Sequence, residues 1–293
     1  MASRSRIEAL VRSELLQPVD ARVAGFAEAI AARYGDAARA VLFYGSCLRE
    51  SQLDGLMLDF YIIVSDYRAA YGPSWYAFAN RVLPPNVFPA QHDGLAAKYA
   101  VLSESDFHER CGPEAGDVSV WARFAQPSRI AWSADEAARE TAIAAVVRAA
   151  PTLLAYAKGV APNAEPIDLW REGFTRTYAS ELRAEREDRP ARIVAQDPAR
   201  YQSFAEAALA DGLPKVQGAS EATWRRFARR GKRLSVLRLL KALTTFSGGA
   251  DYLVWKINRH AGTRIELKPW QRRWPLAGSL VLLPRLLRQG AVR

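Results

Sequence analysis

The spacing of apolar side chains changes along the first third of the chain. Over residues 5–34 they recur every three or four positions, which predicts helix with a break at Gln17-Pro18. Two continuous apolar runs follow, at residues 40–44 and 56–64, and each predicts a buried strand. The first run ends at a Gly-Ser pair, and a single carboxylate interrupts the second.

A third strand is expected after a second helical stretch. Residues 68–81 predict a helix, which a proline pair then ends. The tight-turn pair Asp93-Gly94 precedes an apolar run at 98–102, which predicts the strand. This succession of strands and helices predicts an α+β fold with a sheet flanked by helices in residues 1–112.

Beyond residue 112 the apolar spacing is helical. Ser133 is the expected N-cap of the first of these helices, and Pro151 is expected to kink it or to divide it in two. The predicted helices span 134–158, 169–185 and 203–209. We therefore expect a mainly helical domain over 113–218 and a separate basic segment over 219–293.

Composition narrows the class of protein. The 293 residues are 49% hydrophobic and 25% charged, which excludes a mostly disordered chain, a collagen-like repeat and a multi-span membrane protein. Two cysteines cannot form a disulfide framework, so a reducing compartment is expected. The N-terminal residues lack the unbroken apolar core of a secretory signal.

The positive charge is concentrated at the C-terminal end. Residues 221–293 hold 17 Lys and Arg against three acids, whereas the first 220 residues hold 24 basic and 28 acidic side chains. Such asymmetry predicts a polyanionic partner, either an anionic membrane surface or a nucleic acid.

The Gly-Ser pair and the strand carboxylate suggest a chemistry. A turn at Gly45 allows backbone N–H groups to approach phosphates closely, and Ser46 adds a hydroxyl donor. Asp59, twelve residues further on, lies in an apolar strand where a carboxylate is costly to bury unless it is paired or binds metal. The alternatives are an ordinary strand-ending turn and an Asp at a strand edge or paired with an arginine. A strand that ends in Gly-Ser, followed by a strand that bears a carboxylate, is the arrangement of nucleotidyltransferases. In those enzymes carboxylates hold Mg²⁺ beside a triphosphate.

Four short segments together resemble one family. They are Tyr44-Gly45-Ser46, Met57-Leu58-Asp59-Phe60 continuing to Val64-Ser65-Asp66, Asp93-Gly94 followed by Lys98-Tyr99-Ala100-Val101-Leu102-Ser103, and Ala122-Arg123-Phe124 with Pro127. In this order they resemble the phosphate-binding turn and the "M-[IL]-D-F…V-D-D", "DG…KYGVIS" and "GRLQKP" segments of the mitochondrial-type phosphatidate cytidylyltransferases, also known as translocator assembly and maintenance proteins. A weaker similarity to a later family pattern, at Ser180-Glu181-Leu182-Arg183 and Arg192-Ile193-Val194, extends the resemblance over about residues 40–200.

The sequence departs from the family pattern at the metal site and after the Gly-Ser turn. Many nucleotidyltransferases have a second carboxylate two residues after the first, where this chain has Tyr61. Asp66 and Asp54 are the candidates for the second Mg²⁺ ligand, and Asp66 is the one we choose. The residues after the Gly-Ser turn also differ from the mitochondrial proteins, which suggests a bacterial member.

The resemblance implies a reaction and roles for the residues. CTP and phosphatidic acid would give CDP-diacylglycerol and pyrophosphate, with Mg²⁺ as the cofactor. Asp59 and Lys98 would be catalytic, Asp59 and Asp66 would hold the metal, and Tyr44, Gly45, Ser46 and Arg123 would bind the nucleotide. Arg123 could instead hold the lipid phosphate, and Lys98 could be an ordinary solvated lysine at a strand end. The family also implies a nucleotidyltransferase-like sheet and a winged-helix-like arrangement in 113–218, for which a plain helical bundle is the alternative.

The basic segment fits a membrane surface. Residues 232–246 form an amphipathic pattern, with leucines on a broad face and Arg238 and Lys241 on the other side. Residues 274–287 are apolar but too short to span a bilayer. We expect residues 221–293 to bind an anionic membrane from the cytoplasmic side, as a peripheral protein, and we expect no nucleic-acid partner. The alternative is that the apolar face completes the protein's own core, with its arginines in solvent.

Two other functions stay open. The same fold could transfer a nucleotide to RNA, a small molecule or a protein hydroxyl. The chain could also be a non-catalytic membrane-binding protein on this fold, for which the missing carboxylate at Tyr61 is the best support.

Overall fold

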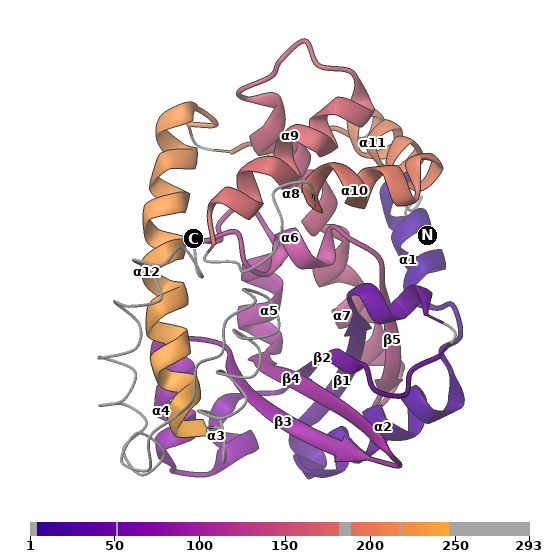
Figure 1. Ribbon diagram of the computed structural model, residues 1–293, viewed down its shortest axis with the longest axis vertical. Coiled ribbons are helices and arrows are strands. Elements are labelled where there is room, and N and C mark those ends of the chain that lie inside the picture. The colour runs from indigo at the N-terminus through magenta and orange to yellow at the C-terminus, as the bar shows by residue number, and fades with distance from the viewer. Residues whose placement is uncertain (1–4, 51, 182–188, 217, 246–293) are drawn as a thin grey trace.

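A computed structural model describes residues 5–50, 52–181, 189–216 and 218–245. A five-stranded sheet with the order β3-β4-β2-β1-β5 lies at its centre (Figure 1). The strands β2 and β4 are parallel, and the other neighbouring pairs are antiparallel. The strands are β1 (Ala38–Tyr44), β2 (Met57–Val64), β3 (Asn86–His92), β4 (Leu95–Ser103) and β5 (Ser128–Ser133). The predicted α+β class, with a mixed sheet flanked by helices, is confirmed.

Alternate residues of the strands build a core on each face of the sheet. On one face Phe60 packs with Phe26 of α2 (Ala21–Ala32). On the other face Tyr61 and Ile63 join a larger core that continues into the helical part of the chain. This second face also carries Asp59, because residues two apart on a strand point the same way.

The turn between β3 and β4 forms where the sequence predicts it. Asp93 and Gly94 both have positive φ, 50° and 75°, as a two-residue hairpin turn requires. His92 and Leu95 pair directly on either side of the turn.

The remaining helices connect the strands and cover the larger core. The short α3 (Tyr67–Tyr71) and α4 (Trp75–Val82) lie between β2 and β3. The others are α1 (Arg6–Leu15), α5 (Glu104–Cys111), α6 (Trp121–Phe124), α7 (Glu136–Val147), α8 (Ala149–Lys158), α9 (Pro166–Ala179), α10 (Arg189–Gln196), α11 (Pro198–Asp211) and α12 (Glu221–Thr245).

The stretch predicted over 134–158 is divided into two helices, one of the two expected outcomes, but its N-cap and the position of the break differ from the prediction. Ser133 ends β5, and Asp135 instead caps α7 by accepting a hydrogen bond from the backbone N–H of Ala138. The break falls at Arg148, so Pro151 lies in the first turn of α8, where its missing N–H leaves no hydrogen bond unmade.

The boundary expected at residue 112 does not separate two cores. β5 comes after that boundary and pairs with β1, so the sheet takes strands from both of the predicted domains. One apolar cluster extends from Ile7 of α1 through the sheet to Trp224 of α12. From residue 134 to 216, the regular elements that the structure describes are all helices, which fits the bundle alternative for this part.

The structure describes only part of the predicted basic segment 219–293. Among the described residues, no helix has both the length and the apolar character needed to cross a membrane. Residues 246–293, with the apolar stretch 274–287, lie outside the described residues.

Candidate active site

Three of the predicted site residues lie side by side across the sheet. Asp59 on β2 pairs in register with Tyr44 on β1 and with Lys98 on β4. The Lys98 Nζ lies 3.0 Å from the Asp59 Oδ1, and the two side chains are 30% and 22% exposed. The Oδ1 atom is buried and faces the Lys98 ammonium group, with which it forms this ion pair. The strand register therefore creates a partly open, charged pair on the larger-core face.

The Gly-Ser turn brings backbone against this carboxylate. Gly45 has φ 95°, a conformation that L side chains rarely adopt. A Cβ at Gly45 would lie 3.2 Å from the Asp59 Oδ2 and 3.6 Å from the Asp59 Cβ. Ser46, the next residue, is exposed and begins a short 3₁₀ helix. Glycine is required here by both the backbone angle and the close approach of Asp59, and the carboxyl group points toward the turn.

Tyr61, which stands where a second carboxylate was sought, belongs to the core. It is 3% exposed, and its ring packs against Tyr44 and Phe124, with centroids 5.3 and 5.2 Å away. Burial raises the pKa of the Tyr61 hydroxyl. The aromatic side chain thus fills the space between the sheet and α6, the helix that carries Arg123.

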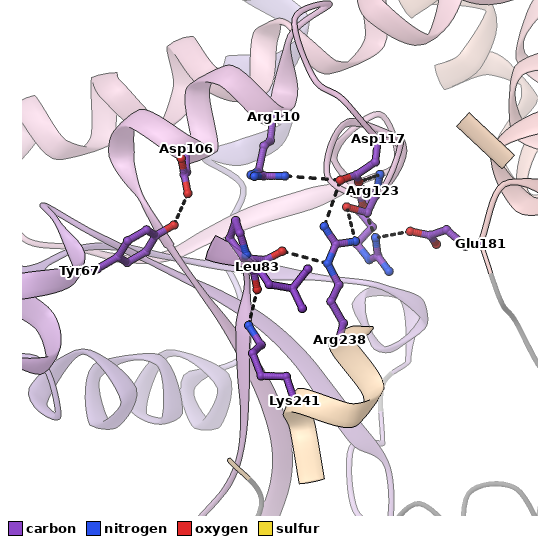
Figure 2. Close-up of polar contacts among 11 residues, drawn as sticks. Tyr67, Leu83, Asp106, Arg110, Asp117, Arg123, Glu181, Arg238 and Lys241 are labelled. Carbon is purple, nitrogen blue, oxygen red and sulfur yellow. Dashed lines mark hydrogen bonds and ion pairs between the residues drawn. The ribbon is translucent and has the colours of Figure 1, made fainter. Parts of the chain in front are cut away.

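Arg123 reaches the site from the helical half of the chain. Its Nη1 donates to the Ser119 carbonyl and lies 3.3 Å from the Glu181 Oε1 (Figure 2). Burial opposes the guanidinium charge, but Glu181, Tyr61 and Tyr44 more than offset that effect and place the pKa of Arg123 well above its ordinary value. Burial, followed by the nearby Asp59 charge, places the pKa of the Tyr44 hydroxyl well above its ordinary value. The structure thus brings Arg123 together with Tyr44.

A buried carboxylate that the sequence analysis missed organises the cations behind Arg123. The Asp117 Oδ2 accepts from Arg238 at 3.0 Å and from Arg110 at 3.4 Å, and its Oδ1 accepts from the Ser119 N–H at 2.9 Å (Figure 2). Burial alone would raise the pKa of Asp117, but Arg238, Ser119 and Arg110 hold it at about 2. Because Ser119 is bonded to Asp117, Arg238 and Arg123, a polar chain connects α12 to the site.

The start of α12 completes the core through Trp224 and Phe227, but the helix around Arg238 and Lys241 has the reverse of the orientation expected from the core-completing alternative. Arg238 and Lys241 do share a face opposite the leucines, but that face is turned toward the protein. The Arg238 Nε donates to the Pro84 carbonyl at 2.9 Å, and the Lys241 Nζ donates to the Leu83 carbonyl (Figure 2). The Lys241 Nζ also donates to the Pro85 carbonyl at 2.8 Å. Burial, followed by the Arg238 charge, lowers the pKa of Lys241 to about 7. These two cations bind the loop before β3 and do not project into solvent.

Asp66 is not a partner of Asp59, and the prediction that both hold one metal is wrong. Asp66 follows the opposite end of β2, and seven residues of extended strand correspond to about 23 Å. Its Oδ1 accepts from the N–H groups of Arg68 and Ala69, at 2.8 and 2.9 Å, and so caps α3. The other candidate, Asp54, pairs with Arg22 at 2.8 Å.

The donor set at the site fits Mg²⁺ through one carboxylate. Within the described residues, no three His, Cys, Asp or Glu side chains are arranged to hold a metal ion. Mg²⁺ at phosphate-transfer sites is commonly held by one or two carboxylates together with substrate phosphates and water. Asp59 can be that carboxylate, since its Oδ2 atom faces the Gly45 turn while Oδ1 is paired with Lys98.

Comparison with known proteins leaves the family unassigned. Neither the protein-family models nor the curated proteins compared with this sequence match it.

Proposed function

We propose that the chain is a CTP:phosphatidate cytidylyltransferase, which makes CDP-diacylglycerol and pyrophosphate. One observation carries the proposal: Asp59 lies against the backbone of Gly45 and beside Lys98, with Arg123 close to Tyr44. A turn without a side chain, a carboxylate and two cations are the parts that transfer from a triphosphate needs. The choice of CTP and phosphatidic acid comes from the motif resemblance.

The transfer requires little covalent help from the protein. An oxygen of the phosphatidic acid phosphate forms a bond to the α-phosphorus of CTP, and the bond from that phosphorus to the bridging oxygen of the β-phosphate breaks. Pyrophosphate leaves with the electron pair, and no proton has to be removed from the anionic nucleophile. The main barrier is repulsion between two anionic reactants, which positioned cations lower.

Several residues would lower this repulsion between the two anionic reactants. Asp59 would hold Mg²⁺, which when bound would supply positive charge to the α-phosphoryl group and to the leaving pyrophosphate. Lys98 provides a second positive charge on the adjacent strand, and the Gly45 turn admits phosphate oxygens to the backbone. Arg123, fixed by Glu181 and Ser119, binds a phosphate of the nucleotide or of the lipid.

The lipid acceptor requires access to a bilayer, and we place the protein at the cytoplasmic face of the membrane as a peripheral enzyme. The basic residues of α12 support this location, since each cation near an anionic leaflet contributes about 1 kcal/mol to binding. The fraction of the basic segment beyond residue 245 lies outside the described residues.

The test is pyrophosphate release from each of the four nucleoside triphosphates, with and without phosphatidic acid vesicles and with and without Mg²⁺. We expect release with CTP only, and only when both phosphatidic acid and Mg²⁺ are present. Release with an RNA, protein or small-molecule acceptor in place of the lipid would retain the chemistry and overturn the substrate.

A non-catalytic role is the second candidate, and the single carboxylate at the site favours it. A nucleotidyltransferase fold that has lost its second metal ligand can keep its membrane surface without turnover. Calorimetry with CTP and Mg²⁺ separates the two functions: an enzyme binds the pair, whereas the non-catalytic protein sediments with anionic vesicles and binds neither.

A further inference from the structure

The helix α4 carries an exposed aromatic face. Six large apolar side chains are exposed among the described residues, and four of them lie on this two-turn helix. Trp75, Phe78 and Val82 are 60%, 59% and 65% exposed, and Tyr76 is 37% exposed. Their spacing of three and four residues places Trp75, Phe78 and Val82 on one face of the helix.

The helix is fixed to the sheet by its opposite side. Asn80 is fully buried, donates to the Val101 carbonyl of β4 at 2.9 Å and accepts from the Asn86 N–H of β3. The Trp75 and Phe78 rings contact each other, with centroids 5.6 Å apart. The aromatic face is therefore held outward on a rigid support, so its exposure does not come from a loose helix.

Basic side chains lie on the same segment as this face and along the neighbouring helix α12. Residues 67–82 contain Arg68 and Arg81 and no acidic residue. The loop directly after α4 is bound by Arg238 and Lys241, so α12 is fixed beside it, and both helices lie along the same side of the molecule (Figure 1). Six further cations of α12 are exposed, and none forms an ion pair in the part of the chain that the structure describes: Arg225, Arg226, Arg229, Arg230, Lys232 and Arg233.

We propose that the α4 face, defined by Trp75, Phe78 and Val82, inserts into the headgroup region of an anionic lipid bilayer. Tryptophan and phenylalanine beside arginines are the composition that this region favours. The unpaired positive charge decides against a second copy of the chain, since two such surfaces would repel, whereas an anionic leaflet complements them. Only the choice of a bilayer as partner rests on the proposed function. This contact would add a point of attachment to the cations of α12.

A fluorescent label at the face tests the insertion directly. Both native cysteines, Cys47 and Cys111, are buried, so Phe78→Cys in the full chain provides a selectively reactive thiol for an environment-sensitive dye. The matched control is Leu16→Cys, because Leu16 is an exposed leucine, 45% exposed, on another part of the molecule. The vesicles are equal parts phosphatidylcholine and phosphatidylglycerol, or phosphatidylcholine alone, without CTP or phosphatidic acid.

We expect the dye at position 78 to shift to the blue with anionic vesicles and to stay unchanged with neutral ones, while the dye at position 16 stays in water throughout. The pair Trp75→Ser and Phe78→Ser should weaken sedimentation with anionic vesicles about tenfold or more, and Leu16→Ser should not. Bound protein whose label at 78 stays in water would overturn the proposal. So would a shift that depends on protein concentration without vesicles, which would indicate self-association.

Failure of the α4 insertion and failure of the proposed enzymatic function give different results. Cytidylyl transfer is measured separately on phosphatidic acid dispersed in detergent, where no bilayer is present. Insertion of the α4 face without any transfer would retain this inference and remove the proposed function, whereas transfer with no insertion would do the reverse.

Discussion

The two ends of β2 each have an aspartate, and the two carboxylates have different surroundings. Asp59, near the start of the strand, lies against a positive-φ glycine and an ion-paired lysine. Asp66, past the end of the strand, is exposed and accepts two backbone hydrogen bonds at the start of α3. A carboxylate with its oxygens committed to a helix cap stabilises the fold, whereas one that faces cations across a turn is available to a ligand.

The largest contrast is expected from the same substitution at both ends. Asp59→Asn removes the carboxylate that lies against the Gly45 turn, so pyrophosphate release should fall by roughly 10³-fold, comparable with loss of a major charge-stabilising group. Asp66→Asn should retain activity within about twofold, because asparagine caps a helix as well as aspartate does. Equal activity of the two variants would contradict the assignment of Asp59.

The next contrast concerns the cation beside Asp59. Lys98→Met should lower kcat/KM by about 10²-fold, since it removes positive charge where the phosphates gather. Lys98→Arg should recover part of the loss. Because Asp59 and Lys98 are in contact, the double variant Asp59→Asn with Lys98→Met should lose less than the two single losses combined. Additive losses would show that the two side chains act independently.

A third carboxylate, Asp117, extends the comparison to stability. Its folded-state pKa of about 2 is lower than its ordinary value, so its ionised form stabilises the protein above about pH 4 and this contribution is lost as the pH falls toward 2. The free energy of unfolding should fall by about 2 kcal/mol across that window because of this group. Denaturant unfolding of Asp117→Asn should lack that part of the decline. An identical acid profile in both proteins would contradict the role of the Arg238 and Arg110 contacts.

The smallest effects are expected from two glycines with positive φ: Gly45, which lies against Asp59, and Gly72, which ends the helix that Asp66 caps. Gly45→Ala and Gly72→Ala both force a side chain to positive φ, so each should cost about 1–2 kcal/mol of stability by denaturant unfolding. A Cβ at Gly72 meets nothing within 4 Å, whereas at Gly45 it would displace the Asp59 carboxylate. Only Gly45→Ala should therefore also reduce transfer, measured at a temperature where both variants are folded.

The sequence analysis predicts the elements that local patterns determine. Strands β1 and β2 are continuous apolar runs, and the Asp93-Gly94 turn has its own backbone chemistry. Strand β3 was missed because it contains Pro89 and lies at the sheet edge with half-exposed side chains. Strand β5 was missed because it is short and pairs with β1 across an intervening stretch of about eighty residues.

The site was predicted only where its residues belong to a motif. Asp59 and Lys98 come together because their strands pair in register, and Gly45 directly follows Tyr44, which pairs with Asp59. The motifs that resemble the family include all three residues. The contacts of Asp117 and Arg123 are with residues 121 and 58 positions away, and no local pattern indicates such pairs. For α12, helical spacing correctly grouped Arg238 with Lys241. Spacing alone could not show that this face binds the carbonyls of residues 83–85.

The place of β5 in the sheet has a consequence for synthesis of the chain. During translation the backbone edge of β1 stays open until residues 128–133 have left the ribosome, and an open edge is a template for pairing with other chains. A fragment that ends at residue 112 keeps that edge permanently. Such a fragment should aggregate on expression, even though it contains Asp59, Lys98 and the Gly-Ser turn, and the shortest soluble piece must extend past β5.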